Sequence, residues 1–104
     1  MSEKNILTIE ERLDSGNSDN LKVAASELIN NGTDSIIIDF SNTKFIDSMG
    51  LGSLVSILKQ TTQKNIKIAL CSLSPQVRQI FELTRLYRLF DIYESTEEAE
   101  KELQ

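Results

Sequence analysis

Short apolar runs alternate along the chain with longer stretches in which apolar residues recur at helical spacing. Residues 35–40 and 66–71 are continuous apolar runs, which are typical of strands covered on both faces. Residues 5–13 are rich in β-branched side chains and predict one further strand, and residues 89–93 predict a last short one. Each of these four expected strands is followed by a segment with helical periodicity.

The segments between the strands carry apolar residues at i, i+3, i+4 and i+7, which predicts amphipathic helices. The first helix follows the turn cluster at residues 14–17 and is expected to be capped by Ser18. Residues 74–75, a serine before a proline, predict a sharp helix start, and residues 95–98 form a capping box. The expected inner faces are Leu21, Ala24, Ala25 and Leu28; Leu51, Leu54, Val55 and Leu58; Val77, Ile80, Phe81 and Thr84; and Ala99 with Leu103.

The order of these elements, β-α repeated four times, predicts an α/β fold. Strands joined by helical crossovers run parallel, so we expect a central, mostly parallel sheet with flanking helices. With 104 residues, the whole chain, 1–104, is expected to form a single domain. In such sheets ligands and partners bind at the carboxyl ends of the strands, where loops 14–18, 41–48 and 72–74 are expected.

Composition removes several kinds of chemistry. The chain has no histidine, which excludes the usual Ser-His-Asp and Cys-His nucleophile pairs and histidine metal sites. The single cysteine, Cys71, cannot form an internal disulfide, and its place in an apolar strand predicts an inert core residue. We therefore expect no catalytic residue, no cofactor and no metal site.

The charge of the chain is acidic overall and unevenly placed. The formal net charge is −5, which argues against nucleic acid as a partner. Residues 1–58 and 89–104 are acidic, whereas residues 59–88 carry 6 basic and 1 acidic side chain. This pattern indicates either an ordinary solvated surface or a bipolar surface that steers a charged protein partner. No leader-like apolar region opens the chain and no apolar run approaches the roughly 18 residues of a membrane span, so a cytoplasmic location is expected.

Residues 39–52, DFSNTKFIDSMGLG, are the most informative stretch. Gly50 and Gly52 fall in the first turns of the second helix, where each glycine costs about 1 kcal/mol relative to alanine. Two interpretations remain open. The glycines allow a close approach of the helix to a neighbouring strand, or they leave backbone uncovered for a partner to touch.

Ser48 also has two interpretations. A serine at a helix start is usually the cap, but Asp47 directly precedes it and can cap the helix itself. The Ser48 hydroxyl would then be free at the working edge of the sheet. A phosphate there would face the free N–H groups at the helix N-terminus, and it would place about −1.5 to −2 charges beside Asp47. A modification that the fold tolerates and a docked partner rejects is the behaviour expected of a phosphorylation switch.

Other chemical assignments of this edge are weaker. Asp14 and Asp39 precede working-edge loops and are either turn residues or partner contacts. Activation of Ser48 as a nucleophile would depend on a lysine such as Lys44, and the Gly-x-Ser-x-Gly motif is absent. Neither a dinucleotide fingerprint nor a phosphate-binding loop is present.

The run Phe45-Ile46-Asp47-Ser48-Met49-Gly50-Leu51-Gly52 after the strand 36–40 resembles the STAS-domain anti-sigma factor antagonists of bacteria. Residues 70–77 and 81–86 are similar to the next strand and helix of that family, and Leu13-Asp14 resembles its Leu-Asp element. The resemblance implies that the unphosphorylated protein binds an anti-sigma factor that is also a serine kinase and so frees the sigma factor. It further implies that the kinase inactivates the antagonist by phosphorylating Ser48, and that a metal-dependent serine phosphatase resets it.

Several residues around Ser48 are expected to meet the partner. Met49 stands where a second small residue is common in the family, so its longer side chain bears on partner choice. Two alternatives stay open beside the switch, a STAS module that only scaffolds a signalling or lipid-transport assembly and a nucleotide-binding STAS domain. The expected partner contacts around the phosphorylation site are Asp14, Asp39, Asp47, Met49, Gly50, Leu51 and Gly52.

Overall fold

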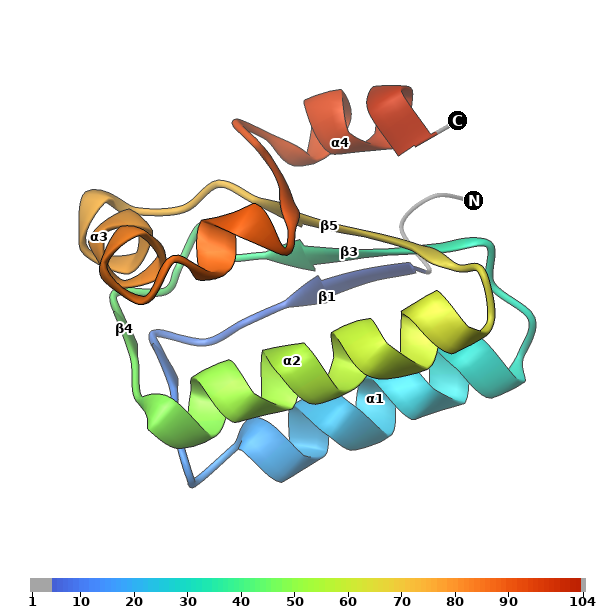
Figure 1. Cartoon of the computed structure of the whole chain (residues 1–104), viewed down its shortest axis with the longest axis horizontal. Helices are drawn as coiled ribbons and strands as arrows, with labels where there is room; N and C mark the ends of the chain where they lie inside the picture. The colour runs from blue at the N-terminus through green and yellow to red at the C-terminus, as the bar shows by residue number, and fades with distance from the viewer. Residues whose placement is uncertain (1–4, 104) are drawn as a thin grey trace.

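Four parallel strands form the central sheet in the computed structural model, which describes residues 5–103 (Figure 1). The spatial order is β1-β3-β5-β6, so each helical crossover carries the chain to a parallel neighbour. This confirms the expected α/β class and the parallel sheet. The strands are β1 (Ile6–Thr8), β3 (Ser35–Asp39), β5 (Lys67–Cys71) and β6 (Asp91–Tyr93).

A second, two-stranded parallel sheet lies beside the carboxyl end of the first. It pairs β2 (Arg12–Leu13) with β4 (Phe45–Ile46). The expectation of one strand over residues 5–13 is therefore wrong. Ile9 donates the last hydrogen bond to the main sheet, to the Asp39 carbonyl oxygen, and is buried, so the chain turns away there and pairs again with β4.

Helices cover both faces of the central sheet (Figure 1). α1 (Ser18–Asn30) and α2 (Ser48–Gln63) lie side by side on one face, and α4 (Thr96–Leu103) covers the other. α3 (Pro75–Thr84) and the 3-10 helix η2 (Leu86–Arg88) lie at the end of the sheet where β4 runs.

The hydrophobic core is correspondingly divided into two layers. The larger one packs α1, α2 and α3 against the sheet and contains edge-to-face contacts of Phe81 with Phe40 and Phe90. The smaller one packs Ala99 of α4 against Ile37, Ala69 and Cys71. Cys71 is fully buried, as expected, and burial raises the pKa of its thiol to about 11.

The helix starts agree only in part with the sequence-based expectations. Ser74 accepts a hydrogen bond from the Val77 N–H and Pro75 opens α3, as expected. Ser18 does not cap α1: the N-cap is Asn17, and Ser18 is buried in the first turn because the Asp14 carbonyl oxygen accepts its N–H.

The expected capping box at the start of α4 is present in a modified form, whereas the expected inner face of α3 is wrong at one residue. At the start of α4, the Ser95 hydroxyl accepts the Glu98 N–H, and the Glu98 carboxylate accepts the N–H of Glu94, one residue earlier than in a regular capping box. Thr84 is exposed rather than part of the inner face of α3. Within residues 5–103, no helix is long and apolar enough to span a bilayer.

Candidate functional site

The segment before α2 is held against the segment before α1 by backbone hydrogen bonds. The Lys44 N–H donates to the Glu11 carbonyl oxygen at 2.8 Å, and the Asp47 N–H donates to the Leu13 carbonyl oxygen at 3.1 Å. Leu13 is paired in register with Ile46. The residues that follow this pair, Asp14 and Asp47, are consequently brought to the same edge.

The loop after β5 joins the same edge. The Ser74 hydroxyl, besides capping α3, donates to the Thr43 carbonyl oxygen at 3.0 Å. Thr43 is fully buried, and its hydroxyl donates to the Glu10 carbonyl oxygen at 2.8 Å. The three loops expected at the working edge therefore converge, held by hydrogen bonds to buried or half-buried groups.

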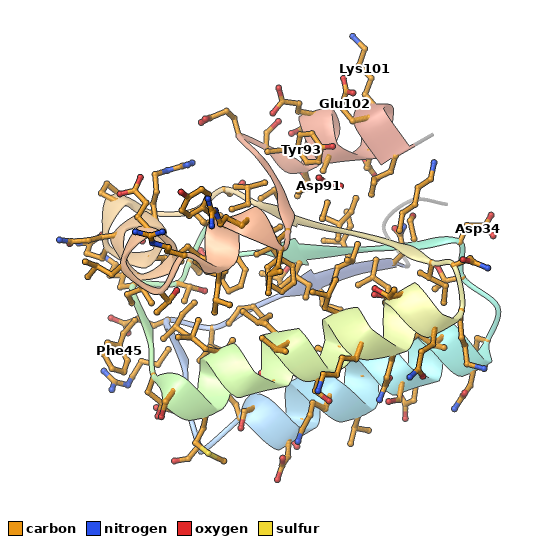
Figure 2. The ribbon with its side chains drawn as sticks, viewed as in Figure 1. Asp34, Phe45, Asp91, Tyr93, Lys101 and Glu102 are labelled. Carbon is orange, nitrogen blue, oxygen red and sulfur yellow. The ribbon has the colours of Figure 1, made fainter. Side chains whose placement is uncertain are left out.

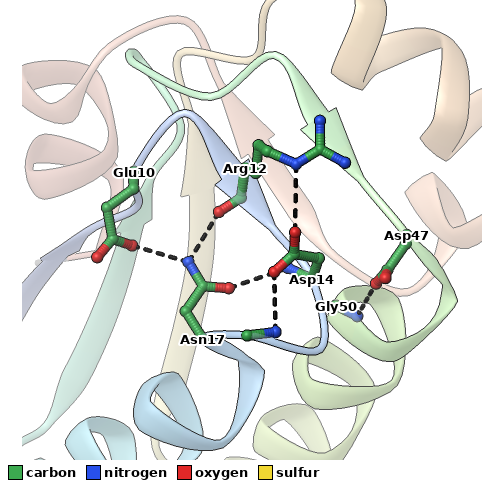
Figure 3. A network of polar contacts seen from close by, with 7 residues as sticks. Glu10, Arg12, Asp14, Asn17, Asp47 and Gly50 are labelled. Carbon is green, nitrogen blue, oxygen red and sulfur yellow. Dashed lines mark hydrogen bonds and ion pairs between the residues drawn. The ribbon is translucent and has the colours of Figure 1, made fainter.

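Asp47, not Ser48, caps α2. Its carboxylate Oδ1 accepts the Gly50 N–H at 2.8 Å (Figure 3). Its carbonyl oxygen accepts the Leu51 N–H at 2.9 Å. Ser48 is the first helical residue and is exposed. Among residues 5–103, its hydroxyl has no hydrogen-bond partner, so the oxygen is free to meet solvent or another molecule.

The backbone around this hydroxyl is electropositive. The cap satisfies the N–H of Gly50, whereas the N–H groups of Ser48 and Met49 have no acceptor in the part of the chain that the structure describes. Unsatisfied N–H groups and the aligned peptide dipoles together give a helix N-terminus a partial positive charge, which favours a phosphate group.

The two glycines of α2 have different surroundings. A Cβ atom on Gly50 would collide with the carbonyl oxygen of Leu13 and would lie 2.9 Å from side-chain atoms of Leu13 and Ile46. A Cβ atom on Gly52 would meet nothing within 4 Å, and Gly52 is exposed. Packing therefore explains Gly50, whereas no packing demand within the described structure explains Gly52.

Three apolar residues close to Ser48 in the sequence reach the surface. Met49 is 56% exposed and Phe45 is 39% exposed, and Leu51 is half-buried. Phe45 projects outward at the end of the molecule where α2 begins (Figure 2). The Arg12 guanidinium lies over the Phe45 ring, 4.3 Å from its centroid, in a cation–π contact that holds both side chains.

Arg12 and Phe45 were not among the expected site residues. Each is the outward-facing member of a two-residue strand whose other residue, Leu13 or Ile46, points into the core. Only Arg12-Leu13 shows the alternation of a polar and an apolar residue in the sequence, since Phe45 and Ile46 are both apolar. Two residues are in any case too few for that pattern to predict a strand.

Asp14 is a turn residue in this structure. Its carboxylate accepts the Gly16 N–H at 2.9 Å and the Arg12 Nε–H at 3.2 Å (Figure 3). These two interactions, the Gly16 hydrogen bond first, hold the pKa of the Asp14 carboxyl below its usual value. Asn17 closes the turn from the other side: its amide nitrogen donates to Arg12 O at 2.8 Å and to the Glu10 carboxylate at 3.0 Å.

Asp39 lies apart from this network. It ends β3, and its carboxylate accepts the Ser41 N–H at 2.9 Å, which forms a separate turn. The structure thus unites Asp14, Asp47 and Gly50 around Leu13 and leaves Asp39 in the main sheet. Within residues 5–103, no group of three or more histidine, cysteine or acidic side chains is placed to hold a metal ion.

The chain is similar in sequence and fold to known proteins. The family model of the STAS domain matches residues 3–99. The anti-sigma F factor antagonist of Paenibacillus polymyxa is 28% identical over 95% of the chain and 86% of its own length. The anti-sigma-B factor antagonist of Staphylococcus aureus is 33% identical over 64% of the chain and 61% of its own length. The solution structure of the Thermotoga maritima protein TM1081 superposes with a TM-score of 0.85 at 32% identity, covering 94% of this chain and 79% of that one.

Proposed function

Because the chain belongs to the STAS domain family, we propose that it is an anti-sigma factor antagonist switched by phosphorylation of Ser48. In its unphosphorylated form it binds an anti-sigma factor, and the sigma factor held by that protein is released. The names of the relatives from Paenibacillus polymyxa and Staphylococcus aureus support the first part of this proposal.

The observation that carries the proposal is the free hydroxyl of Ser48 at the start of α2. Asp47 takes over the capping role, so Ser48 is not needed to close the helix. Its side chain is exposed, and the apolar side chains of Phe45 and Met49 beside it are exposed too. An accessible hydroxyl bordered by apolar surface suits a protein interface that a single modification can block.

Phosphorylation would act on the interface rather than on the fold. The phosphate would be stabilised by the N–H groups of Ser48 and Met49 and by the dipole of α2. It would also place about −1.5 to −2 charges beside the Asp47 carboxylate. A partner that packs against this edge would have to desolvate the phosphate without supplying a counter-charge, which weakens the complex.

In this proposal, the partner packs its surface over the first turn of α2. Gly52 presents bare backbone there, which a partner can approach closely because no Cβ intervenes. Met49, Leu51 and Asp47 make the other contacts of this turn with the partner. Gly50 allows the turn to pack closely against β2, because it has no Cβ. Asp14 and Asp39 act mainly by shaping the adjacent loops.

The switching chemistry is supplied by other proteins. A serine kinase, which we take to be the anti-sigma factor itself, transfers the γ-phosphoryl group of ATP to the Ser48 oxygen. The new O–P bond replaces the bond to the β-phosphate oxygen, ADP leaves, and a base of the kinase takes the hydroxyl proton. A serine phosphatase reverses the change by hydrolysing the ester to serine and inorganic phosphate. The antagonist acts in the cytoplasm and catalyses neither step.

The experiment is a labelling reaction with the cognate kinase and ATP, read by intact-mass and peptide mass spectrometry. We expect one phosphoryl group on Ser48 and none on a Ser48→Ala variant. Ser15→Ala is the matched control, because Ser15 is an exposed serine in the neighbouring loop 14–17 and should leave labelling unchanged. Labelling that survives Ser48→Ala, or that disappears with Ser15→Ala, would overturn the assignment.

A further inference from the structure

A second surface of the molecule, at the C-terminal end of α3 and along η2, is both apolar and basic. Within residues 83–89, Leu83 is 76% exposed, Leu89 52% and Tyr87 47%. Arg85 and Arg88 lie among them and are exposed as well, and the segment contains no acidic residue. Contiguous exposed apolar side chains mark interaction sites, and tyrosine and arginine are enriched where interfaces bind most strongly.

This surface borders a cavity of about 540 Å³ between α3, η2 and β6. Its apolar lining comes from Leu73, Phe81 and Ile92. Its polar lining comes from Arg78 and Glu82 of α3, from Arg85 directly after that helix, and from Tyr87 of η2. The cavity can therefore receive an apolar side chain while its rim meets charged groups.

Two arginines and one carboxylate, Glu82, line the cavity, so its lining has a net positive charge. Arg78 lies 3.9 Å from the exposed carboxylate of Glu94, the long limit of an ion pair. Arg85 forms no ion pair with any residue in the range 5–103. Its backbone is left-handed, with φ 63°, a conformation that costs free energy for a residue with a side chain. Arg85 is the C-cap of α3, which accounts for its left-handed backbone, and its exposed guanidinium is available to a carboxylate of a docked partner.

We propose that this surface, defined by the cavity and residues 83–89, docks an acidic protein segment whose apolar side chain enters the cavity. Its aspartate or glutamate residues pair with Arg78 and Arg85, and flanking apolar residues cover Leu83 and Leu89. Charge complementarity selects this occupant: residues 59–88 are the basic region of the chain. The net charge of −5 of the whole chain disfavours approach to nucleic acid or an anionic membrane, which present charge over a much larger area.

The surface does not depend on the proposed switch. The two surfaces adjoin at loop 72–74, where Leu73 lines the cavity and Ser74, the N-cap of α3, donates to the Thr43 carbonyl oxygen. Arg78, Arg85 and Tyr87, on which the proposal depends, lie outside the Ser48 edge. One partner can therefore dock here whether or not Ser48 is phosphorylated. The effect of Ser48→Asp on binding at this surface distinguishes the two proposals.

The experiment is a titration of the isotope-labelled full chain with a short synthetic peptide carrying a leucine and a phenylalanine between glutamates, followed by amide chemical shifts. We expect shifts confined to the cavity and to residues 83–89, saturating with a Kd at or below about 1 mM. Arg85→Gln and Arg78→Gln should each raise the Kd about fivefold, and added salt should raise it further. Tyr87→Ala should also weaken binding, while Lys59→Gln, on an exposed part of α2 outside the cavity, should not.

Several results would overturn the proposal. These are the absence of localised shifts, equal effects of Arg85→Gln and Lys59→Gln, and equal binding of a peptide in which lysine replaces glutamate. Binding of anionic lipid vesicles but not of the acidic peptide would also overturn it, as would self-association of the chain through residues 83–89 in analytical ultracentrifugation. Ser48→Asp should leave the peptide Kd unchanged, so failure of the Ser48 switch and failure of this surface are separate outcomes.

Discussion

Substituting each glycine of α2 by alanine should change the stability of the protein in opposite directions. Gly50 faces β2, where an added Cβ would collide with the Leu13 carbonyl oxygen, a backbone atom that cannot rotate away. Gly52 faces open space, where an added Cβ would meet nothing within 4 Å. The two positions lie in the same helix and undergo the same chemical change, so each is the control for the other.

The change in the free energy of unfolding depends on helix propensity, on overpacking and on one backbone hydrogen bond. Alanine in place of glycine in a helix gains about 1 kcal/mol, and at Gly52 this gain stands alone. At Gly50 the overpacking costs about 1–3 kcal/mol. Displacing the Leu13 carbonyl also weakens the hydrogen bond that it accepts from the Asp47 N–H, worth about 1 kcal/mol. We therefore expect Gly52→Ala to stabilise by up to about 1 kcal/mol and Gly50→Ala to destabilise by about 2 kcal/mol.

Urea unfolding followed by circular dichroism measures both free energies. For a domain of this size, the two changes correspond to a Tm raised by about 4 °C and a Tm lowered by about 10 °C. Equal effects of the two substitutions, or a stabilising Gly50→Ala, would refute the packing argument. If Gly52→Ala is more stable and yet binds the anti-sigma factor less well, the bare backbone at this position serves the interface rather than the fold.

Three further predictions concern the supporting structure. Asn17→Ala should lower the free energy of unfolding by about 1–2 kcal/mol in urea titrations, because the hydrogen bonds that close loop 14–17 are lost; an unchanged midpoint would show that the turn holds without them. Cys71 should resist iodoacetamide at pH 8 in the folded protein and react readily in urea, since burial raises its pKa to about 11; equal rates would contradict this. Asp14 has a lowered pKa in the fold, so the stability that its ionised form contributes is present above its unfolded pKa of about 3.8 and is lost as the pH falls below that value. Asp14→Asn, which keeps an oxygen for the Gly16 N–H, should flatten this acid dependence in urea titrations at several pH values, and an unaltered profile would exclude the carboxylate as its source.

The order of helices and strands was predictable because most of them carry strong local patterns. The continuous apolar runs of β3 and β5 and the Ser74-Pro75 start of α3 needed no knowledge of the rest of the chain. The capping of α2 by Asp47 was offered by the sequence as one of two alternatives, and the structure selects it.

What the sequence could not predict depends on contacts between distant residues. β2 and β4 are two-residue strands that form only because they pair with each other. A local pattern does not show such pairing, so the sequence predicted a single strand over residues 5–13. The sequence predicted Ser18 as the cap of α1, but in the structure the Ser18 N–H donates to the Asp14 carbonyl oxygen and Asn17 is the N-cap. The sequence likewise cannot distinguish Gly50 from Gly52, because only the position of β2 beside the helix shows that Gly50 is packed against Leu13 and Gly52 is not.

The most direct test of the account compares the affinity of the cognate anti-sigma factor for the protein with and without a phosphate on Ser48, by titration calorimetry. We predict that phosphorylation weakens binding at least about tenfold, a loss of about 1.4 kcal/mol or more, while the circular dichroism spectrum stays the same. Equal affinity of the two forms would contradict the switch, and loss of the folded spectrum on phosphorylation would contradict the claim that the fold tolerates the modification.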